Sequence, residues 1–190
     1  MRIISGKFSG RPLASPKGRT TRPTADRTRE SLFNLLQHRD DFSFEGARII
    51  DLFAGSGAFG FEAMSRGGAF CLFVETDAAA RGAIRDNIEA LSLFGETRLH
   101  RRSATTLGPK PAGVGPAFTL AFLDPPYGKN AAEPALNSLL GGGWVVPGAI
   151  IVVEQGEKEE PVRARGYEEI DRRHYGAAQI GLYRVANAPT

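Results

Sequence analysis

One glycine-rich segment indicates the fold: Asp51-Leu52-Phe53-Ala54-Gly55-Ser56-Gly57-Ala58-Phe59-Gly60. It has the spacing G-x-G-x-x-G and lies between a predicted strand at 47–52 and a predicted helix that runs to about residue 66. Glycines at such a turn let a ligand approach the backbone closely. An acid about 20 residues further on, here Glu75, is placed to bond a ribose hydroxyl. The segment therefore predicts a strand–turn–helix unit that binds a nucleoside-containing cofactor.

Two cofactors are compatible with this turn, a nicotinamide dinucleotide and S-adenosylmethionine. Asp51 favours the second, because a carboxylate at the strand end would repel a pyrophosphate but attract the ammonium and sulfonium groups of adenosylmethionine. Glu75 does not discriminate, since both cofactors contain a ribose. In a purely structural interpretation, the glycines only make a tight turn and Asp51 caps the next helix. We expect adenosylmethionine to bind here.

Strand-like and helical patterns alternate from residue 47 onward, as in a doubly wound α/β domain. After the first unit, strands are expected at 70–74, 97–101, 118–123 and 149–154, helices at 78–93 and 131–140, and a terminal antiparallel pair at 167–174 and 179–185. A hairpin about Gly6–Gly10 and a helix over 25–39 are expected before it. The predicted fold is Rossmann-like, with a mostly parallel seven-stranded sheet and an antiparallel C-terminal strand.

The apolar run at 118–123 ends in the tetrapeptide Asp124-Pro125-Pro126-Tyr127. Two consecutive prolines cannot extend a strand, because neither has an N–H to donate. A carboxylate, free carbonyls and an aromatic ring are thus expected at a strand's carboxyl end, the edge where open α/β sheets bind ligands. The acceptors suit an amino group and the ring suits a flat base, so the tetrapeptide is a candidate catalytic site. The alternative is a strand-ending loop in which Asp124 is only a turn residue.

Positive charge is concentrated near the N-terminus. Residues 1–29 carry eight lysines and arginines against one acid, Asp26, a net charge of +7, while the whole chain has +3. A basic segment before a mildly acidic body indicates a polyanionic partner. The basic residues expected to contact this polyanion are Arg2, Lys7, Arg11, Arg19, Arg22, Arg27 and Arg29.

Length, the absence of long apolar stretches and the cysteine count limit the classes of protein to which this chain can belong. The length of 190 residues fits one domain or one domain with a short appendage. No apolar stretch approaches the roughly 18–20 residues of a membrane span, and the N-terminus lacks the apolar region of a signal peptide. The single cysteine, Cys71, excludes an internal disulfide framework and reads as a buried apolar residue. We expect a cytoplasmic protein with no membrane partner and no metal.

The glycine turn, Glu75 and the tetrapeptide together resemble adenosylmethionine-dependent N-methyltransferases that act on exocyclic amines. More specifically, the chain is similar to the RsmD family, in order and spacing over nearly its whole length, at Met1-Arg2-Ile3-Ile4-Ser5-Gly6, Arg22-Pro23-Thr24-Ala25-Asp26-Arg27-Thr28-Arg29-Glu30, Phe33-Asn34 and Tyr183-Arg184. The resemblance implies methylation of the N2 amine of a guanine in small-subunit (16S) ribosomal RNA, free or within an assembling or assembled subunit. It also implies a basic RNA-binding extension with the first helix at 1–39 and a class I methyltransferase domain at 40–190.

The resemblance assigns roles to residues. The implied cofactor-binding residues are Asp51, Phe53, Gly55, Ser56, Gly57, Glu75, Thr76, Ser103, Ala104 and Asp124, and the implied catalytic residues are Asp124, Pro125, Pro126 and Tyr127. Ser103 is a departure, since the family normally has an acid there that meets the adenine amino group. Asn87 fits the family's habit, and it equally fits an exposed polar position on a helix.

Three other functions compete with this one. A DNA adenine-N6 methyltransferase would share the pocket, but 190 residues leave little room for a target-recognition region. A protein-glutamine methyltransferase would also suit the loop, although Asn usually replaces the Asp there. The third is an RNA-binding module with a vestigial methyltransferase fold. The presence of Asp51, Glu75 and Asp124 argues against it.

Overall fold

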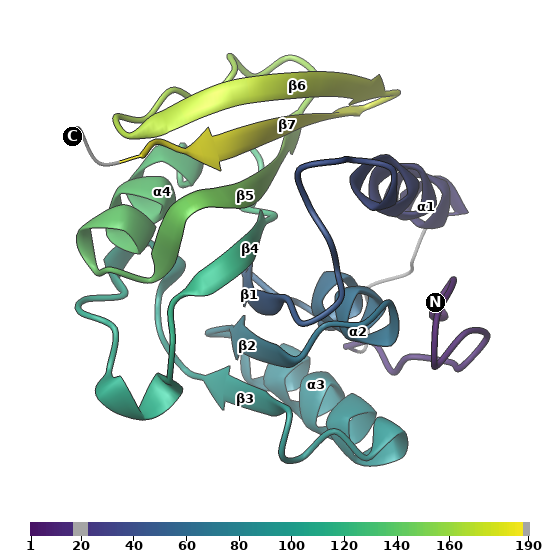
Figure 1. The fold of residues 1–190 in the computed structure, drawn as a ribbon. Helices are drawn as coiled ribbons and strands as arrows, with labels where there is room; N and C mark the ends of the chain where they lie inside the picture. The colour runs from purple at the N-terminus through teal and green to yellow at the C-terminus, as the bar shows by residue number, and fades with distance from the viewer. Residues whose placement is uncertain (17–22, 188–190) are drawn as a thin grey trace. The chain divides into compact units, whose positions relative to one another are not determined.

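The computed structural model describes residues 1–16 and 23–187, which form two compact units, Met1–Arg101 and Arg102–Thr190 (Figure 1). Two of the predicted RNA-binding residues, Arg19 and Arg22, lie outside the described residues. The predicted boundary after residue 39 separates an RNA-binding extension from a methyltransferase domain. It is defined by function rather than by compactness, and it stays a prediction.

The first unit is built on parallel strands. Strands β1 (Arg48–Leu52), β2 (Phe70–Val74) and β3 (Thr97–His100) pair in the order β3-β2-β1. Their connections are the helices α2 (Ala58–Ser65) and α3 (Ala78–Leu91), and α1 (Pro23–Gln37) precedes them. The interior residues of β1 and β2 are buried, as parallel strands covered on both faces should be. This order brings the end of β2 beside the glycine turn that follows β1.

The predicted N-terminal hairpin is confirmed. Arg2 and Pro12 form an antiparallel bridge, and the Ile3 N–H donates to the Arg11 carbonyl at 2.9 Å. The turn of this hairpin packs on α2: a β-carbon at Gly6 (φ +85°) would lie 1.9 Å from the Ser65 carbonyl oxygen. A side chain at Gly6 is therefore incompatible with the docked hairpin.

The second unit has mixed strands. Strands β4 (Phe118–Leu123) and β5 (Val145–Gly156) are parallel, β7 (Ala178–Val185) is antiparallel to β5, and β6 (Tyr167–Tyr175) pairs with β7. Helix α4 (Ala132–Gly141) and short 3-10 turns at Ala104–Thr106 and Ala112–Val114 complete it. Trp144 is fully buried, stacks on Phe118, and donates from its indole nitrogen to the Gly108 carbonyl at 2.7 Å.

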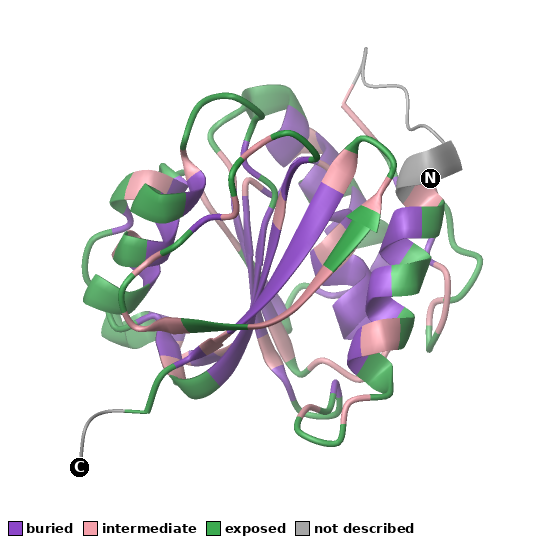
Figure 2. Ribbon diagram, turned by 90° about the horizontal axis from the view of Figure 1, so that it is seen from above, coloured by how far each residue is buried: buried purple, intermediate pink, exposed green. Residues whose placement is uncertain are grey.

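The predicted fold class is confirmed: the part of the chain that the structure describes has seven strands, mostly parallel, with antiparallel pairing at the C-terminus. The bounds of β2 and β4 agree with the prediction. β5 begins four residues earlier than predicted. Pro147 and Gly148 interrupt the apolar pattern of the sequence there, although the irregular strand continues through them. Figure 2 shows buried residues along most of the strands, while β6 is intermediate or exposed, and the helices carry exposed residues as well as buried ones. None of the helices in residues 1–16 and 23–187 is long and apolar enough to cross a membrane.

Candidate active site

The glycine turn is wound tightly between β1 and α2. Phe53, Gly55 and Gly57 all have positive φ angles, of 57°, 58° and 78°. For Phe53 this left-handed conformation costs roughly 1–2 kcal/mol, and such strain is concentrated at functional sites. A β-carbon at Gly57 would lie 2.7 Å from the Phe61 ring and 2.9 Å from the Phe73 ring, so this position requires glycine.

Asp51 lies at the end of β1 and is buried. Its Oδ2 accepts a hydrogen bond from the Gly60 N–H at 3.0 Å, in the first turn of α2. A carboxylate there is stabilised by the helix N-terminus. The capping role considered from the sequence is thus present, and it fixes this carboxylate directly before the glycine turn.

Glu75 joins the end of β2 to the glycine turn. Its Oε2 accepts from the Gly55 N–H at 2.8 Å, and its Oε1 accepts from the Asp77 N–H at 2.8 Å. Thr76 beside it is exposed. The structure therefore brings Asp51, Glu75 and the glycine turn together in the first unit.

Asn87 is buried on α3, so it is not an exposed helix residue. Its Oδ1 accepts from the Ala14 N–H at 2.7 Å, and its Nδ2 donates to the carbonyls of Ala14 and Ser56, each at 3.1 Å. One amide therefore holds both the chain that follows the hairpin and the glycine turn. The signal in the sequence was its spacing, three residues after Ile84 and four before Leu91, on the apolar face of the helix.

Replacing Asn87 by Leu is expected to lower the free energy of unfolding by about 1–3 kcal/mol, because the substitution keeps the volume but removes three part-buried hydrogen bonds to the backbone of Ala14 and Ser56. Urea denaturation measures the effect. Asp86→Ala on the exposed face of the same helix is the control, and its expected effect is within about 0.5 kcal/mol. Equal losses in the two variants would contradict the role given to the Asn87 amide.

The basic hairpin is docked on α2 by side chains that no sequence motif predicts. Glu62 is fully buried and accepts from the Ile4 N–H at 2.7 Å and the Ser5 N–H at 3.1 Å. Its Oε1 also accepts from the Arg66 guanidinium at 2.8 Å. Ser65 adds a bond to the Phe8 N–H at 2.9 Å. Residues 1–14 are thus part of the first unit.

The basic side chains divide into two groups. Arg2, Lys7, Arg11 and Arg27 are exposed, although Arg11 donates to the Ala90 carbonyl at 2.7 Å. Arg29 is buried, forms an ion pair with Asp26 at 3.2 Å and donates to the Arg2 carbonyl at 2.7 Å. Its guanidinium therefore stabilises the first unit, and the accessible positive charge comes from the exposed group.

In the second unit, the predicted catalytic loop follows β4. Asp124 and Pro126 are exposed and Pro125 is buried. Tyr127 is 51% exposed, and its hydroxyl donates to Glu154 Oε1 at 2.8 Å. Burial, followed by the negative charge of Glu154, raises the pKa of Tyr127, so that the phenol keeps its proton and acts as the donor. No sequence motif indicates a role for Glu154.

A second carboxylate holds the far end of this loop. Glu159 accepts from the N–H groups of Gly128 and, at 2.8 Å, Gly156. Two residues of the loop have left-handed backbone conformations: Gly128, with a φ of +72°, and Asn130, with a φ of +48°. A pocket of about 240 Å³ lies beside the loop, and its lining includes Pro125, Pro126, Gly128, Gln155, Glu159 and Glu160.

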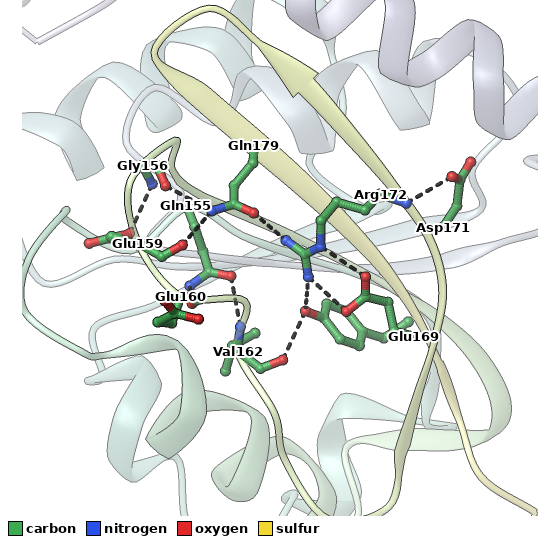
Figure 3. A network of polar contacts seen from close by, with 10 residues as sticks. Gln155, Gly156, Glu159, Glu160, Val162, Glu169, Asp171, Arg172 and Gln179 are labelled. Atoms are coloured by element: carbon green, nitrogen blue, oxygen red, sulfur yellow. Dashed lines mark hydrogen bonds and ion pairs between the residues drawn. The ribbon is translucent and has the colours of Figure 1, made fainter.

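Two buried glutamines fix the segment that carries Glu159 (Figure 3). Gln155 donates to the Glu160 carbonyl and accepts from the Val162 N–H, both at 3.0 Å. Gln179 donates to the carbonyls of Gly156 and Glu159 at 3.0 and 2.6 Å. Its oxygen accepts from Arg172, which also forms a two-pronged bond with Glu169. These bonds tie the chain after β5 to the sheet, and Glu159 in turn bonds the Pro-Pro-Tyr loop at Gly128.

Ser103 has a local structural role. Its Oγ accepts from the Thr105 N–H at 3.3 Å and lies 2.8 Å from Thr105 Oγ1, so it caps the 3-10 turn that begins at the buried Ala104. Among residues 1–16 and 23–187, no three His, Cys, Asp or Glu side chains gather as a metal-binding group. Cys71 is buried, as expected, and burial raises the pKa of its thiol.

Comparisons with known proteins cover nearly the whole chain. The family model described as "Conserved hypothetical protein 95" matches residues 1–184. The protein named "Putative rRNA methyltransferase YlbH", from Bacillus subtilis, is 34% identical over 185 residues, which are 97% of this chain and 98% of that protein. "Ribosomal RNA small subunit methyltransferase D" of Haemophilus influenzae is 36% identical over 85% of this chain and 81% of its own length. A solved structure titled "Putative methyltransferase yhhF from Escherichia coli" has a TM-score of 0.82 and 31% identity, with 99% of both chains covered.

Proposed function

Because the chain belongs to the family described as Conserved hypothetical protein 95, which is the RsmD family, we propose that it is an adenosylmethionine-dependent ribosomal RNA methyltransferase. The proposed target is the N2 amine of a guanine in small-subunit (16S) RNA, in the cytoplasm, where the subunit assembles. The observation that carries the proposal is the extent of the family match: residues 1–184 include the hairpin, the glycine turn and the Pro-Pro-Tyr loop.

The residues of the glycine turn fit the chemistry of adenosylmethionine, which supplies an electrophilic methyl group. Asp51 offers a negative charge to the cationic methionine end. Both oxygens of Glu75 already accept backbone N–H groups, but each carboxylate oxygen has a further lone pair that can accept a ribose hydroxyl. Gly55 and Gly57 allow close approach, and we assign the supporting contacts to Phe53, Ser56, Thr76, Ser103 and Ala104.

The Pro-Pro-Tyr loop fits an aromatic amine. The N2 lone pair of guanine is delocalised into the ring, so the amine is a poor nucleophile. In the proposed mechanism Asp124 and the Pro125 carbonyl each accept one N–H, which favours a pyramidal nitrogen with its lone pair exposed. The N–C bond would form as the methyl–sulfur bond of the sulfonium breaks and its electron pair stays on a neutral thioether; the nitrogen thereby becomes acidic, and Asp124 takes up its proton. Tyr127 stacks on the base, which must first leave its RNA stack.

Two measurements test this function. Calorimetric titration should show one adenosylmethionine bound per chain, which a vestigial fold would not do. Methyl-labelled adenosylmethionine should then label ribosomal RNA but not DNA or protein offered in the same assay. Label in DNA or in a protein glutamine would replace the RNA assignment by one of its rivals.

The proposed RNA surface is formed by the exposed side chains of Arg2, Lys7 and Arg27 in the first unit. Changing all three to Glu is expected to weaken ribosomal RNA binding about tenfold or more at moderate salt. The slope of log K against log salt should become smaller, by about 0.7 for each lost contact with single-stranded RNA. Filter binding over a salt series measures both quantities.

The control changes three exposed arginines elsewhere to Glu and so has the same net charge: Arg85, Arg165 and Arg173. If this control weakens RNA binding as much as the Arg2, Lys7 and Arg27 triple variant does, net charge rather than a defined surface attracts the RNA.

A further inference from the structure

We propose that Glu154 is a positioning residue for the target base: it holds the phenol of Tyr127, so that the stacking face of the ring is already oriented before RNA arrives. This inference rests on the proposed function, in which Tyr127 stacks on the guanine. It adds a residue of β5 to a site that the sequence places in the Pro-Pro-Tyr loop.

The contact itself is specific. The Tyr127 hydroxyl donates to Glu154 Oε1 at 2.8 Å, although 27 residues separate the two in the chain. As a whole residue, Tyr127 remains 51% exposed. A tyrosine that served only to fill the interior would have its ring buried. Tyr127 instead bonds through its hydroxyl group while the residue stays about half exposed. That arrangement suits a ring that receives a stacked base.

Glu154 can hold the Tyr127 hydroxyl in place because its own backbone is part of the sheet. It pairs with Ile180 of β7 and lies between the buried residues Val153 and Gln155. Burial raises the pKa of Glu154, and the hydrogen bond from Tyr127 lowers it again by favouring the carboxylate. A phenol that donates to a carboxylate makes a stronger hydrogen bond than one between neutral groups.

The backbone of the loop is held independently of the ring. Glu159 accepts from the N–H of Gly128, the residue after Tyr127, and Figure 3 shows the bonds that Glu159 makes with Gly156 and Gln179. These bonds determine the path of the chain, but they leave the side-chain torsions of Tyr127 undetermined. The bond to Glu154 fixes the hydroxyl end of the ring, and we infer that it thereby favours one ring orientation.

A double-mutant cycle tests the proposal on the full-length enzyme with ribosomal RNA. Glu154→Ala and Tyr127→Phe should each lower kcat/KM for RNA about tenfold, mainly through KM, because each removes a charge-assisted hydrogen bond. The double variant should be no worse than either single variant, and adenosylmethionine affinity should stay unchanged. Glu154→Gln should recover most of the activity, since its amide oxygen still accepts the phenol O–H. Glu168→Ala, on an exposed position of β6, is the matched control and should match wild type.

A second measurement follows the ring without any methyl transfer. In protein with isotope-labelled tyrosine, the NMR signal that disappears in Tyr127→Phe belongs to Tyr127, and in Glu154→Ala it should move toward that of free tyrosine. If the wild type is active but the kinetic losses of the two single variants add up in the double variant, the positioning role of Glu154 is overturned and the proposed function stands. A wild type that methylates no RNA would overturn this role together with the proposed function, and the two failures are thereby distinguished.

Discussion

Asp124→Ala is expected to lower kcat for methyl transfer at least about a hundredfold while leaving adenosylmethionine affinity within a few-fold of wild type. The side chain accepts one N–H of the target amine and takes its proton in the proposed mechanism, and losing one preorganised partner of a reacting group typically costs about 10²–10³ in rate. Because Asp124 is exposed, the variant should fold normally. Single-turnover kinetics with labelled cofactor measure the chemical step directly.

Asp124→Asn separates the two parts of this role. Asn keeps one acceptor oxygen but lacks the charge that receives the proton, so its rate should lie between those of wild type and Asp124→Ala. Glu133→Ala removes an exposed carboxylate nine residues further on and should leave the rate unchanged. Undiminished turnover by Asp124→Ala would refute the catalytic assignment.

Glu62→Ala is expected to give the largest loss of stability, about 3–5 kcal/mol, because it removes one partner of a buried ion pair. The Arg66 side chain, only 4% exposed, would keep its charge without the carboxylate that it donates to. The N–H groups of Ile4 and Ser5 would lose their acceptor at the same time. The hairpin should then undock, so RNA binding should weaken together with the free energy of unfolding measured in urea.

The control for this prediction is Glu89→Ala, an exposed acid on α3, with an expected change within about 0.5 kcal/mol. If Glu62→Ala does not fold well enough to measure, Glu62→Gln retains one acceptor and should give an intermediate loss. A loss below about 1 kcal/mol in Glu62→Ala would show that the hairpin is held mainly by other contacts.

The fold was predictable where apolar runs have clear ends. β2 and β4 are continuous apolar segments, each followed by an acid, and their bounds were predicted to the residue. β5 was predicted short because Pro147 and Gly148 interrupt its pattern, and no local signal shows that β4 pairs with residues on both sides of that interruption. Local patterns thus predict which elements exist better than where an irregular strand begins.

The candidate site was predictable where its chemistry is local in sequence. The glycine turn and the Pro-Pro-Tyr loop carry their signal in consecutive residues. Glu62 and Glu154 do not, because their roles depend on partners 57 or 58 and 27 residues away. In the sequence each reads as one more acid within an apolar helix or strand, and only the tertiary structure shows what it holds.

The proposed activity of this chain is methylation of a guanine N2 of small-subunit ribosomal RNA. The most direct measurement incubates the protein and labelled adenosylmethionine with that RNA, and with assembled subunits, from cells that lack the protein, and then maps the labelled nucleoside. The expected result is N2-methylguanosine at a single position, absent when Asp124→Ala replaces the wild type. Label on an adenine, or no incorporation into either substrate by a protein that binds the cofactor, would contradict the claim.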